Sequence, residues 1–291
     1  MALHQYSLNF EQEQLIGLPK KIAAKPFLKW AGGKTRLLHA LRRYIPSCFG
    51  TYFEPFLGGG ALFFDVAPDI AVLGDANPEL INCYKVVKDS PHLLLRELAK
   101  LTISESEYYR VRALAPEELS PVERAARFIY LNKTCYNGLY RVNKSGQFNT
   151  PFGKHTKVKL ADSNTLGAAS ALLQSSLLMC GDYRTVVENA IRGDFVYFDP
   201  PYLPVSRFSD FKRYTKEFFY EEDHQMLADV FAALADKGCY VLLSNSFHEK
   251  IASLYSGFHQ EQVLMPRFVN CKGEGRGSVT ELLISNYEPG K

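Results

Sequence analysis

Two consecutive prolines, Pro200 and Pro201, end a short run of apolar and aromatic residues that begins at Asp194. The run has the length and composition of a buried β-strand, and the prolines stop it because neither can donate a backbone hydrogen bond. Asp199 and Tyr202 flank the pair, so a carboxylate and an aromatic ring are expected at the carboxyl edge of a sheet. Ligand crevices of open α/β sheets lie at this edge. The motif therefore indicates a ligand site; an ordinary strand end with a surface aspartate is the alternative.

A second strand-like run, residues 51–57, leads into three glycines, Gly58 to Gly60, and then into the start of an apolar helix. Glycines at such a position let the backbone approach a ligand closely at the positive end of a helix. The next strand-like run ends in Asp75, where Rossmann-like sites place the acid that binds a ribose diol. Strand, glycines, helix, strand and acid together indicate a nucleoside cofactor. A βαβ unit in which Asp75 only caps a helix is the alternative.

The tripeptide Gly33-Lys34-Thr35 resembles the end of a phosphate-binding P-loop. A P-loop requires a glycine five residues before Gly33, where this chain has Leu28, so a nucleotide triphosphate site is not favoured. A glycine turn that caps the following helix is a simpler alternative. We favour a loop whose lysine, Lys34, helps to close a small-molecule site beside the only tryptophan, Trp30.

Residues 78–119 show a helical pattern of apolar residues, which predicts a helical insertion rather than another βα unit. The stretch 124–159 is basic and contains no Asp or Glu, and aromatic residues are interleaved with its lysines and arginines. A turn signal at residues 143–146 predicts that 139–142 and 147–150 pair as a β-hairpin. Such a stretch favours a reader of a nucleic-acid groove, with a solvated basic face over an aromatic mini-core as the alternative.

The strand pattern resumes at residues 177–182, which again end in an acid, Asp182. A helix is expected over 223–236 and a strand over 238–245. The last two strands, 259–265 and 279–286, are joined without a helix, which predicts an antiparallel pair at the edge of a parallel sheet. The sequence therefore predicts an α/β protein. Its parts are a Rossmann-like domain with a mostly parallel sheet and an antiparallel C-terminal strand, and a helical insertion with a β-hairpin.

The composition fits a globular protein: of 291 residues, 46% are hydrophobic and 22% are charged. Because the net charge is only +3, any binding of nucleic acid must rest on local charge. No apolar run is long enough for a membrane span, and residues 1–25 lack the apolar core of a secretory signal. The six cysteines form no Cys-x-x-Cys pair, which predicts reduced thiols and no metal site in a cytoplasmic protein.

Four motifs in this order carry a resemblance to a known family. They are Leu28-Lys-Trp-Ala-Gly-Gly-Lys34, then Phe53-Glu-Pro-Phe-Leu-Gly58, then Leu131-Asn-Lys-Thr-Cys-Tyr136-Asn137-Gly-Leu139-Tyr-Arg141 together with Asn149-Thr-Pro151-Phe-Gly153, and finally Asp199-Pro-Pro-Tyr202. From Pro26 to Tyr287 the chain resembles the Dam-family adenine-specific DNA methyltransferases. The resemblance implies a methyltransferase domain of residues 26–78 and 162–291, a target-recognition domain at 79–161 and an N-terminal extension at 1–25.

The same resemblance implies an activity and a setting. The activity is methyl transfer from S-adenosylmethionine to the 6-amino group of adenine in duplex DNA, by base flipping and direct in-line transfer, with GATC as the expected site. Enzymes of this kind are bacterial, archaeal or phage-encoded, so a cytoplasmic, nucleoid-associated protein is implied. The resemblance leaves a cognate restriction endonuclease open as a partner.

Residue roles also follow from the resemblance. The catalytic motif is Asp199, Pro200 and Tyr202. Asp75 matches the acid that binds the ribose hydroxyls, and Asp182 matches the acid near the cofactor adenine. The full set of expected cofactor contacts is Trp30, Lys34, Phe53, Glu54, Pro55, Phe56, Gly58, Asp75, Asn77, Asp182, Tyr183 and Asp199.

DNA contacts are expected mainly in and near the hairpin. Tyr136 and Asn137 would enter the base stack where the adenine leaves, while Leu139, Arg141 and Pro151 would contact base edges. The full set is Lys133, Tyr136, Asn137, Leu139, Arg141, Asn143, Lys144, Pro151, Lys272 and Arg276.

Two residues of this region, Tyr140 and Thr150, depart from the commonest wording of the family. Neither departure removes a residue expected to read bases. Both leave the recognition sequence open.

The residues agree with this chemistry. The lone pair of the adenine amino group is delocalised into the ring, so attack on a sulfonium methyl benefits from two acceptors for the amino hydrogens. Asp199 and the carbonyl of Pro200 can supply them, and Tyr202 can stack on the flipped base. Carbon-5 methylation of cytosine instead needs a cysteine, typically after a proline, and the sequence contains no Pro-Cys pair.

Two alternative functions remain open at this point. The first is an RNA adenine or amino-cytosine methyltransferase that uses the same cofactor domain. The second is a basic architectural protein that binds DNA without catalysis. The second does not explain why acids end three strands or why glycines follow the first.

Overall fold

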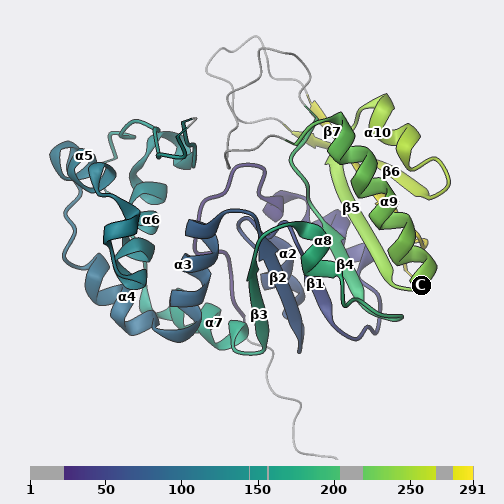
Figure 1. Ribbon diagram of the computed structural model, residues 1–291, viewed down its shortest axis with the longest axis horizontal. Coiled ribbons are helices and arrows are strands. Elements are labelled where there is room, and N and C mark those ends of the chain that lie inside the picture. The colour runs from purple at the N-terminus through teal and green to yellow at the C-terminus, as the bar shows by residue number, and fades with distance from the viewer. Residues whose placement is uncertain (1–22, 144, 156, 204–218, 267–277, 291) are drawn as a thin grey trace, which may run out of the picture.

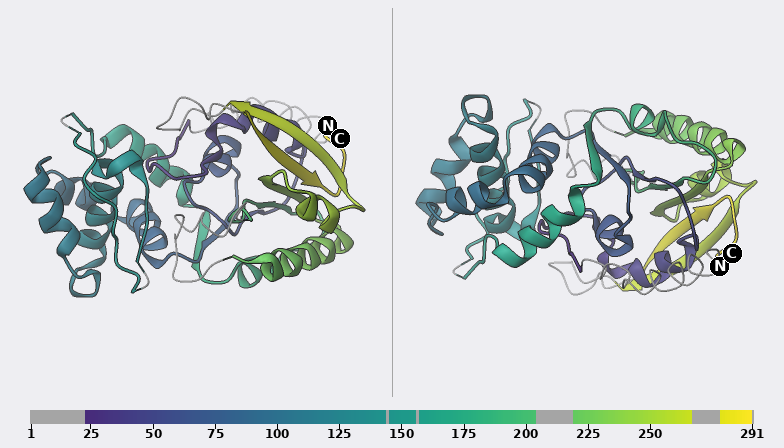
Figure 2. Two further views of the ribbon diagram at one scale, coloured as in Figure 1. Left: turned by 90° about the horizontal axis from the view of Figure 1, so that it is seen from above. Right: turned by 90° about the horizontal axis from the view of Figure 1, so that it is seen from below.

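The computed structural model describes residues 23–143, 145–155, 157–203, 219–266 and 278–290. The expected N-terminal extension lies almost wholly outside these ranges, and so do three DNA-contact candidates, Lys144, Lys272 and Arg276. The described chain forms two parts that lie side by side: a sheet covered by helices, and a helical part (Figures 1 and 2).

Within the described residues, seven strands form one sheet in the order β3-β2-β1-β4-β5-β7-β6. The strands are β1 (Tyr52–Glu54), β2 (Ala71–Asp75), β3 (Ser176–Cys180), β4 (Phe195–Phe198), β5 (Tyr240–Ser246), β6 (His259–Pro266) and β7 (Ser278–Ser285). The pairs from β3 to β5 are parallel, and β7 is antiparallel to both β5 and β6. The predicted sheet is confirmed, with β7 placed between β5 and the edge strand β6.

Ten α-helices lie in the described chain. They are α1 (Leu38–Leu41), α2 (Ala61–Val66), α3 (Pro78–Asp89), α4 (Pro91–Leu98), α5 (Glu105–Ala113), α6 (Pro121–Thr134), α7 (Ser163–Leu173), α8 (Tyr183–Val187), α9 (Glu221–Lys237) and α10 (Glu249–Leu254). α3 begins where Asn77 caps it, because the Asn77 side-chain oxygen accepts hydrogen bonds from the next free backbone amides. None of the described helices is long and apolar enough to cross a bilayer.

The central strands are buried on both faces. In β4, Phe195 and Tyr197 join one core cluster, whereas Val196 and Phe198 join another on the opposite face. Helices α1, α2 and α3 cover the first face, and α8, α9 and α10 cover the second. A parallel strand buried on both faces reads as a continuous apolar run, which is why this strand was recognisable in the sequence.

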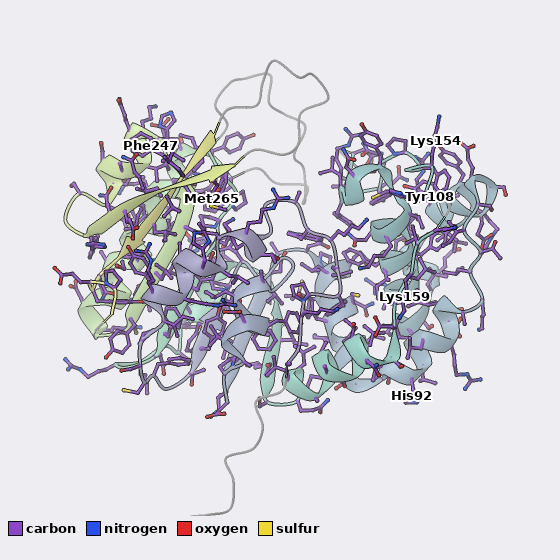
Figure 3. The ribbon with its side chains drawn as sticks, turned by 180° about the vertical axis from the view of Figure 1, so that it is seen from behind. His92, Tyr108, Lys154, Lys159, Phe247 and Met265 are labelled. Carbon is purple, nitrogen blue, oxygen red and sulfur yellow. The ribbon has the colours of Figure 1, made fainter. Side chains whose placement is uncertain are left out.

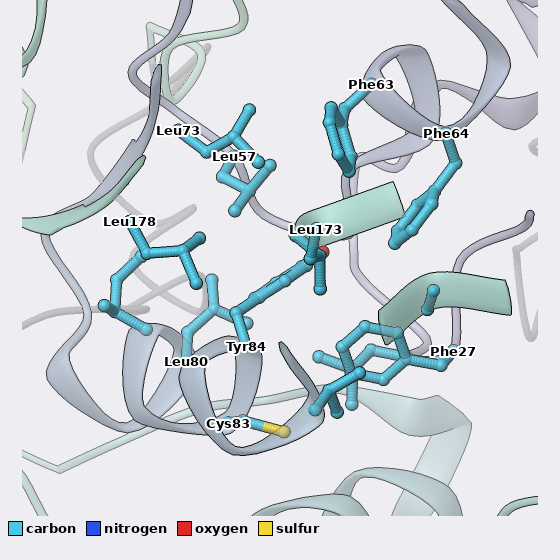
Figure 4. Close-up of a cluster of buried hydrophobic side chains, with 14 of the residues drawn as sticks. Phe27, Leu57, Phe63, Phe64, Leu73, Leu80, Cys83, Tyr84, Leu173 and Leu178 are labelled. Atoms are coloured by element: carbon cyan, nitrogen blue, oxygen red, sulfur yellow. The ribbon is translucent and has the colours of Figure 1, made fainter. Parts of the chain in front are cut away.

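The segment before Trp30 is anchored in the first core cluster. Phe27 meets the ring of Tyr84 from α3 edge to face, with 5.0 Å between the ring centroids. Figure 4 shows these two rings among side chains of α2, β2 and β3, including Phe64 and Leu178. The N-terminal motif is therefore fixed to the sheet by apolar packing.

The helical part is inserted between β2 and β3. α3 leaves the end of β2, α7 leads back to β3, and these two helices pack on each other. α4, α5 and α6 lie further out (Figure 1). Figure 3 shows Tyr108 and Lys154 in this part, with Phe247 and Met265 in the sheet part on the other side of the molecule. The helical pattern expected over residues 78–119 is confirmed.

The predicted hairpin is present, but its ladder is short. Val142 and Phe148 form one antiparallel bridge. Backbone hydrogen bonds extend the pairing from Asn143 to Gln147 at 2.8 Å and from Asn149 to Arg141 at 3.0 Å. We call residues 139–150 the hairpin below.

Candidate active site

Asp199 lies at the carboxyl end of β4, where Pro200 stops the strand. The ammonium nitrogen of Lys34 is 2.6 Å from Oδ1 of Asp199, and Lys34 is only 6% exposed. The Ser244 hydroxyl donates a further, longer hydrogen bond of 3.4 Å to the same oxygen. Both contacts use Oδ1, so Oδ2 has no protein donor among the described residues. Burial raises the pKa of Asp199, while Lys34 and Ser244 oppose that rise.

Tyr202 is held beside this pair. Its hydroxyl donates a 2.6 Å hydrogen bond to Oε2 of Glu281 on β7. The Lys34 ammonium lies 4.9 Å from the centroid of the Tyr202 ring, within the range of a cation–π contact. Because β7 runs antiparallel, Glu281 near its start reaches the edge at which the parallel strands end. The aromatic ring is thereby fixed next to the Asp199 carboxylate, as the sequence motif predicted.

Asp75 ends β2 and binds the backbone on both sides of itself. Its Oδ2 accepts the amide hydrogen of Gly58 at 3.0 Å, and its Oδ1 accepts that of Asn77 at 2.9 Å. Burial raises the pKa of Asp75 to about 6, although both hydrogen bonds act in the opposite direction. Each oxygen keeps lone-pair capacity for a further donor such as a ribose hydroxyl.

Gly58 has a positive φ of 47°, and its place is set by Trp30 as well as by its backbone. A Cβ atom at position 58 would lie 2.6 Å from Cδ1 of Trp30. Gly58 is therefore required by packing as well as by the expected approach of a ligand, because the Trp30 ring already occupies the space of a side chain. Trp30 and the glycine loop after β1 therefore form one packed unit.

On the opposite face of the sheet, the expected adenine-side residues form an aromatic group. The rings of Phe56 and Tyr183 stack with centroids 5.2 Å apart and an interplanar angle of 27°. Asp182 caps α8 and forms an ion pair of 2.7 Å with Arg184, which lowers the pKa of Asp182. Asp182 and Tyr183 are thus brought to the same sheet edge as the glycine loop.

The remaining three expected cofactor residues are deeply placed. Phe53 and Pro55 are buried, and Glu54 is only 2% exposed. One Glu54 oxygen accepts hydrogen bonds from the Tyr52 hydroxyl at 2.8 Å and the Phe63 amide at 3.2 Å. Burial raises the pKa of Glu54 to about 8. These contacts connect the end of β1 to α2 and so fix the two ends of the glycine loop.

The hairpin brings several expected DNA contacts together. The Tyr136 amide donates to the Pro151 carbonyl at 2.9 Å, so these two exposed residues are neighbours. Asn137, also exposed, has a positive φ of 56° in the turn that follows. Leu139 is half-buried at the base of the first arm.

Arg141 is held in place by its own hairpin. Its Nε donates a 2.8 Å hydrogen bond to Oδ1 of Asn149 on the second arm. Among the described residues, no hydrogen bond uses its two terminal nitrogens. Asn143 instead closes the turn, because its side-chain oxygen accepts from the amides of Ser145 and Gln147.

Lys133 lies in the last turn of α6 and is half-buried, unlike these exposed residues. It lines a cavity of about 180 Å³ together with Lys25 and Lys159. Burial and the neighbouring Lys29 and Lys25 lower the pKa of Lys133. The structure therefore gives Lys133 a partly buried, positively charged setting.

Sequence reasoning missed three residues that organise the site. Ser244 and Glu281 contact the catalytic motif, and Asn132 on α6 binds the backbone of Lys29 through both ends of its amide, at 2.9 and 2.6 Å. A polar residue inside an apolar strand was the available signal for Ser244 and Glu281. Asn132 gave none, because only the tertiary fold places α6 beside the N-terminal motif.

The fold and the site together define the class of this protein. A mostly parallel sheet with an antiparallel last strand carries a glycine loop after its first strand, an acid after its second and an acid–proline motif after its fourth. This is the arrangement of a Rossmann-like methyltransferase domain.

Comparison with known proteins gives the family. The D12 class N6 adenine-specific DNA methyltransferases match residues 30–265. The Type II methyltransferase M1.LlaDCHI of Lactococcus lactis subsp. cremoris is 41% identical over 275 residues, which cover 92% of this chain and 97% of the relative. M.MjaIII of Methanocaldococcus jannaschii is also 41% identical, over 286 residues that cover 90% and 99%. The DNA adenine methylase of Escherichia coli K12 is 32% identical over 272 residues, covering 91% and 96%.

The chain therefore belongs to the D12 class of N6 adenine-specific DNA methyltransferases. It is an enzyme that methylates adenine in DNA. Membership of the family implies a methyl donor of the S-adenosylmethionine type.

Proposed function

We propose that this enzyme transfers a methyl group from S-adenosylmethionine itself to the 6-amino group of a flipped adenine in duplex DNA. The observation that carries the proposal is the Asp199 carboxylate at the end of β4, paired with Lys34 and with Oδ2 left for a substrate donor. S-adenosylmethionine supplies an electrophilic methyl group on a positively charged sulfur. The residues of this chain would bind both substrates and orient the amino group for in-line attack.

Asp199 and Pro200 are the proposed acceptors for the two amino hydrogens. Accepting both hydrogens favours a pyramidal nitrogen, whose lone pair is then available for attack. Tyr202, fixed by Glu281, would stack on the extruded base. The Ser244 hydroxyl and the Lys34 ammonium would keep Asp199 in the ionised form that this role requires.

The residues of the glycine loop fit a nucleoside cofactor. Asp75 offers a half-buried carboxylate at the end of β2, where a ribose diol would be bound. Phe56 and Tyr183 offer aromatic faces, and Asp182 an acid, on the adenine side. Trp30, Lys34 and Asn77 would complete the proposed site, with Phe53, Glu54 and Pro55 supporting the loop from below.

The hairpin is the proposed reader of the DNA sequence, with GATC as the proposed site. Tyr136 and Asn137, both exposed, would enter the base stack. Leu139, Arg141 and Pro151 would contact base edges, with the terminal nitrogens of Arg141 on a guanine. Residues 79–161 form the proposed target-recognition domain, and residues 26–78 and 162–291 the proposed catalytic domain.

Two of the relatives are named Type II methyltransferases. We propose on this basis that a cognate restriction endonuclease exists as a partner. Co-expression is the corresponding test: the methylated host should survive an endonuclease that cuts at the same site.

The function is tested by methyl transfer from radiolabelled S-adenosylmethionine to matched duplexes. One duplex carries GATC, others carry one changed base pair, and an RNA duplex of the same sequence tests the RNA alternative. We expect N6-methyladenine in the GATC duplex alone, and no transfer by the Asp199→Ala protein. Methylation of cytosine or of the RNA would contradict the proposal; efficient methylation of a different DNA sequence would contradict GATC only.

A further inference from the structure

Tyr140 lies where the hairpin meets the N-terminal motif. Its ring stacks on the ring of Trp30, with 5.7 Å between centroids and an interplanar angle of 22°. Phe128 and Phe148 pack on it from other sides, at 5.0 and 5.4 Å. Tyr140 is only 8% exposed, so it contributes nothing to the DNA-facing surface itself.

The hydroxyl of Tyr140 makes a second connection, to the side chain of Asn77. The Asn77 oxygen already accepts two backbone amides of α3, so its amide nitrogen is the donor to Tyr140. Burial raises the pKa of Tyr140 to about 12.

Both connections lead to Asp75, one directly through Asn77 and the other through Trp30 and then Gly58. Asn77 donates its backbone amide to Oδ1 of Asp75. Trp30 packs against Gly58, whose amide donates to Oδ2 of Asp75. A single hairpin residue therefore supports the two donors that hold the two oxygens of this carboxylate.

We propose that Tyr140 is a positioning residue for the methyl-donor site, supplied by the hairpin, and that it couples binding of the donor to binding of DNA. This inference rests on the proposed function, in which Asp75 binds the donor and the hairpin binds DNA. A ligand that fixes Asp75, Asn77 and Trp30 also fixes Tyr140, and with it the base of the hairpin. Coupling of this kind is reciprocal, so each ligand tightens the other by the same factor.

The test measures binding rather than turnover, with S-adenosylhomocysteine and a GATC duplex as probes. Calorimetry gives the affinity for each probe alone and in the presence of the other. We expect the unaltered enzyme to bind each probe at least about fivefold more tightly when the other is bound. Tyr140→Leu removes both the stack and the hydroxyl, so its affinity for S-adenosylhomocysteine should fall about tenfold. The ratio of its affinities for one probe with and without the other probe should approach one.

Tyr140→Phe separates the two connections, because it keeps the stack on Trp30 and loses the bond to Asn77. Its loss of affinity should lie between that of Tyr140→Leu and none. Trp30 is the only tryptophan of the chain, so its fluorescence reports the stack directly. The emission should shift in Tyr140→Leu and stay unchanged in Tyr140→Phe.

Tyr108 provides the matched control. Its buried hydroxyl also binds the hairpin, at the Thr150 carbonyl with a distance of 2.8 Å, but its contacts among the described residues do not include Trp30 or Asn77. Tyr108→Phe and Tyr108→Leu should lower stability without changing the affinity for S-adenosylhomocysteine. If Tyr140→Leu fails to fold, the comparison of Tyr140→Phe with Tyr108→Phe decides.

Normal affinity and normal coupling in the Tyr140 variants would overturn the proposal, and so would equal losses in the Tyr140 and Tyr108 variants. A separate outcome is that the unaltered enzyme itself does not bind S-adenosylhomocysteine. That outcome would refute the proposed function, and the inference that rests on it would fall with it.

Discussion

The ammonium of Lys34 lies 2.6 Å from the carboxylate of Asp199, although the two residues come from distant parts of the chain. Lys34 sits in a short 3₁₀ turn after the N-terminal glycines, and Asp199 follows β4. The pair joins a motif expected to bind the cofactor to the motif expected to act on the base. Lys34 thus gains a role at Asp199 that its sequence context did not indicate.

Replacing Lys34 by Met should move the acid limb of the pH–rate profile to higher pH. The reason is that Lys34 lowers the pKa of Asp199 against the effect of burial. Without it the pKa rises further, so the ionised form is lost at a higher pH as the solution is acidified. Single-turnover rates from about pH 5 to pH 9 measure the limb. Lys34→Arg keeps the charge and should stay close to the parent; an unshifted limb in Lys34→Met would argue against the pairing as a functional contact.

Asp199→Asn should reduce the rate of methyl transfer by at least about a hundredfold, the usual loss for one preorganised polar group. The amide replaces one of the two acceptor oxygens of the carboxylate by an NH₂ group, which brings two donors toward the amino group. Donor binding, measured with S-adenosylhomocysteine, should change little. Asp69→Asn, an exposed carboxyl outside the site, is the control. Activity of Asp199→Asn within tenfold of the parent would refute the assignment.

Asp75→Asn should weaken binding of S-adenosylhomocysteine while affinity for DNA alone stays the same. Hydrogen bonds to a charged acceptor contribute about 1.5–3 kcal/mol each, so a loss of roughly ten- to a hundredfold is expected. Because burial raises the pKa of Asp75 to about 6, the affinity of the unaltered enzyme should also fall as the pH drops below that value. Calorimetry at several pH values checks both. Equal losses for donor and DNA would indicate misfolding instead.

Arg141→Ala should slow methylation of GATC and relax discrimination at one guanine–cytosine pair. A two-bond contact between arginine and guanine discriminates by about 1–3 kcal/mol. Lys157→Ala is the control: this exposed lysine lies outside the hairpin, and a lysine that contacts only phosphate affects every sequence alike. It should weaken all duplexes alike and reduce the salt dependence. If Arg141→Ala lowers the rates on all duplexes by one common factor, Arg141 does not read a base.

Glu54→Gln should make thermal stability less dependent on pH. Burial raises the pKa of Glu54 from an ordinary value near 4.5 to about 8, so the folded state holds the proton more tightly than the unfolded state does. The free energy of unfolding therefore decreases as the pH rises from about 4.5 to about 8. Glutamine does not titrate and keeps an oxygen for Tyr52 and Phe63. Melting curves at about pH 6 and pH 9 should show a smaller drop in Tm for the variant than for the parent.

The sheet and the edge at which the site lies were predictable from the sequence. Short apolar runs that end in Asp75, Asp182 and Asp199 determine strand direction and place all three acids at one edge. Proline after β4 and glycines after β1 mark where those strands stop. These signals are local, so they require no knowledge of the tertiary structure.

The contacts between motifs were not predictable, because they join residues that no local pattern relates. Tyr140 and Thr150 were departures from the family wording without a physical reason. The structure supplies a physical reason for each residue. Tyr140 packs on Trp30, and the buried Thr150 hydroxyl donates a 2.7 Å hydrogen bond to the Leu139 carbonyl across the hairpin. Arg141 and Asn149 likewise pair only once the two arms are aligned.

The position of β1 between β2 and β4 has a consequence for biosynthesis. β1 ends at residue 54 and β4 starts at residue 195, so roughly 140 residues must be made before the second neighbour of β1 exists. At ribosomal speeds this interval is on the order of ten seconds, during which one edge of a hydrophobic strand lacks its partner. The helices of the insertion depend mainly on local contacts, so they can form while the residues before β4 are synthesised. A nascent chain stalled before residue 195 is therefore the species most exposed to aggregation and to capture by chaperones.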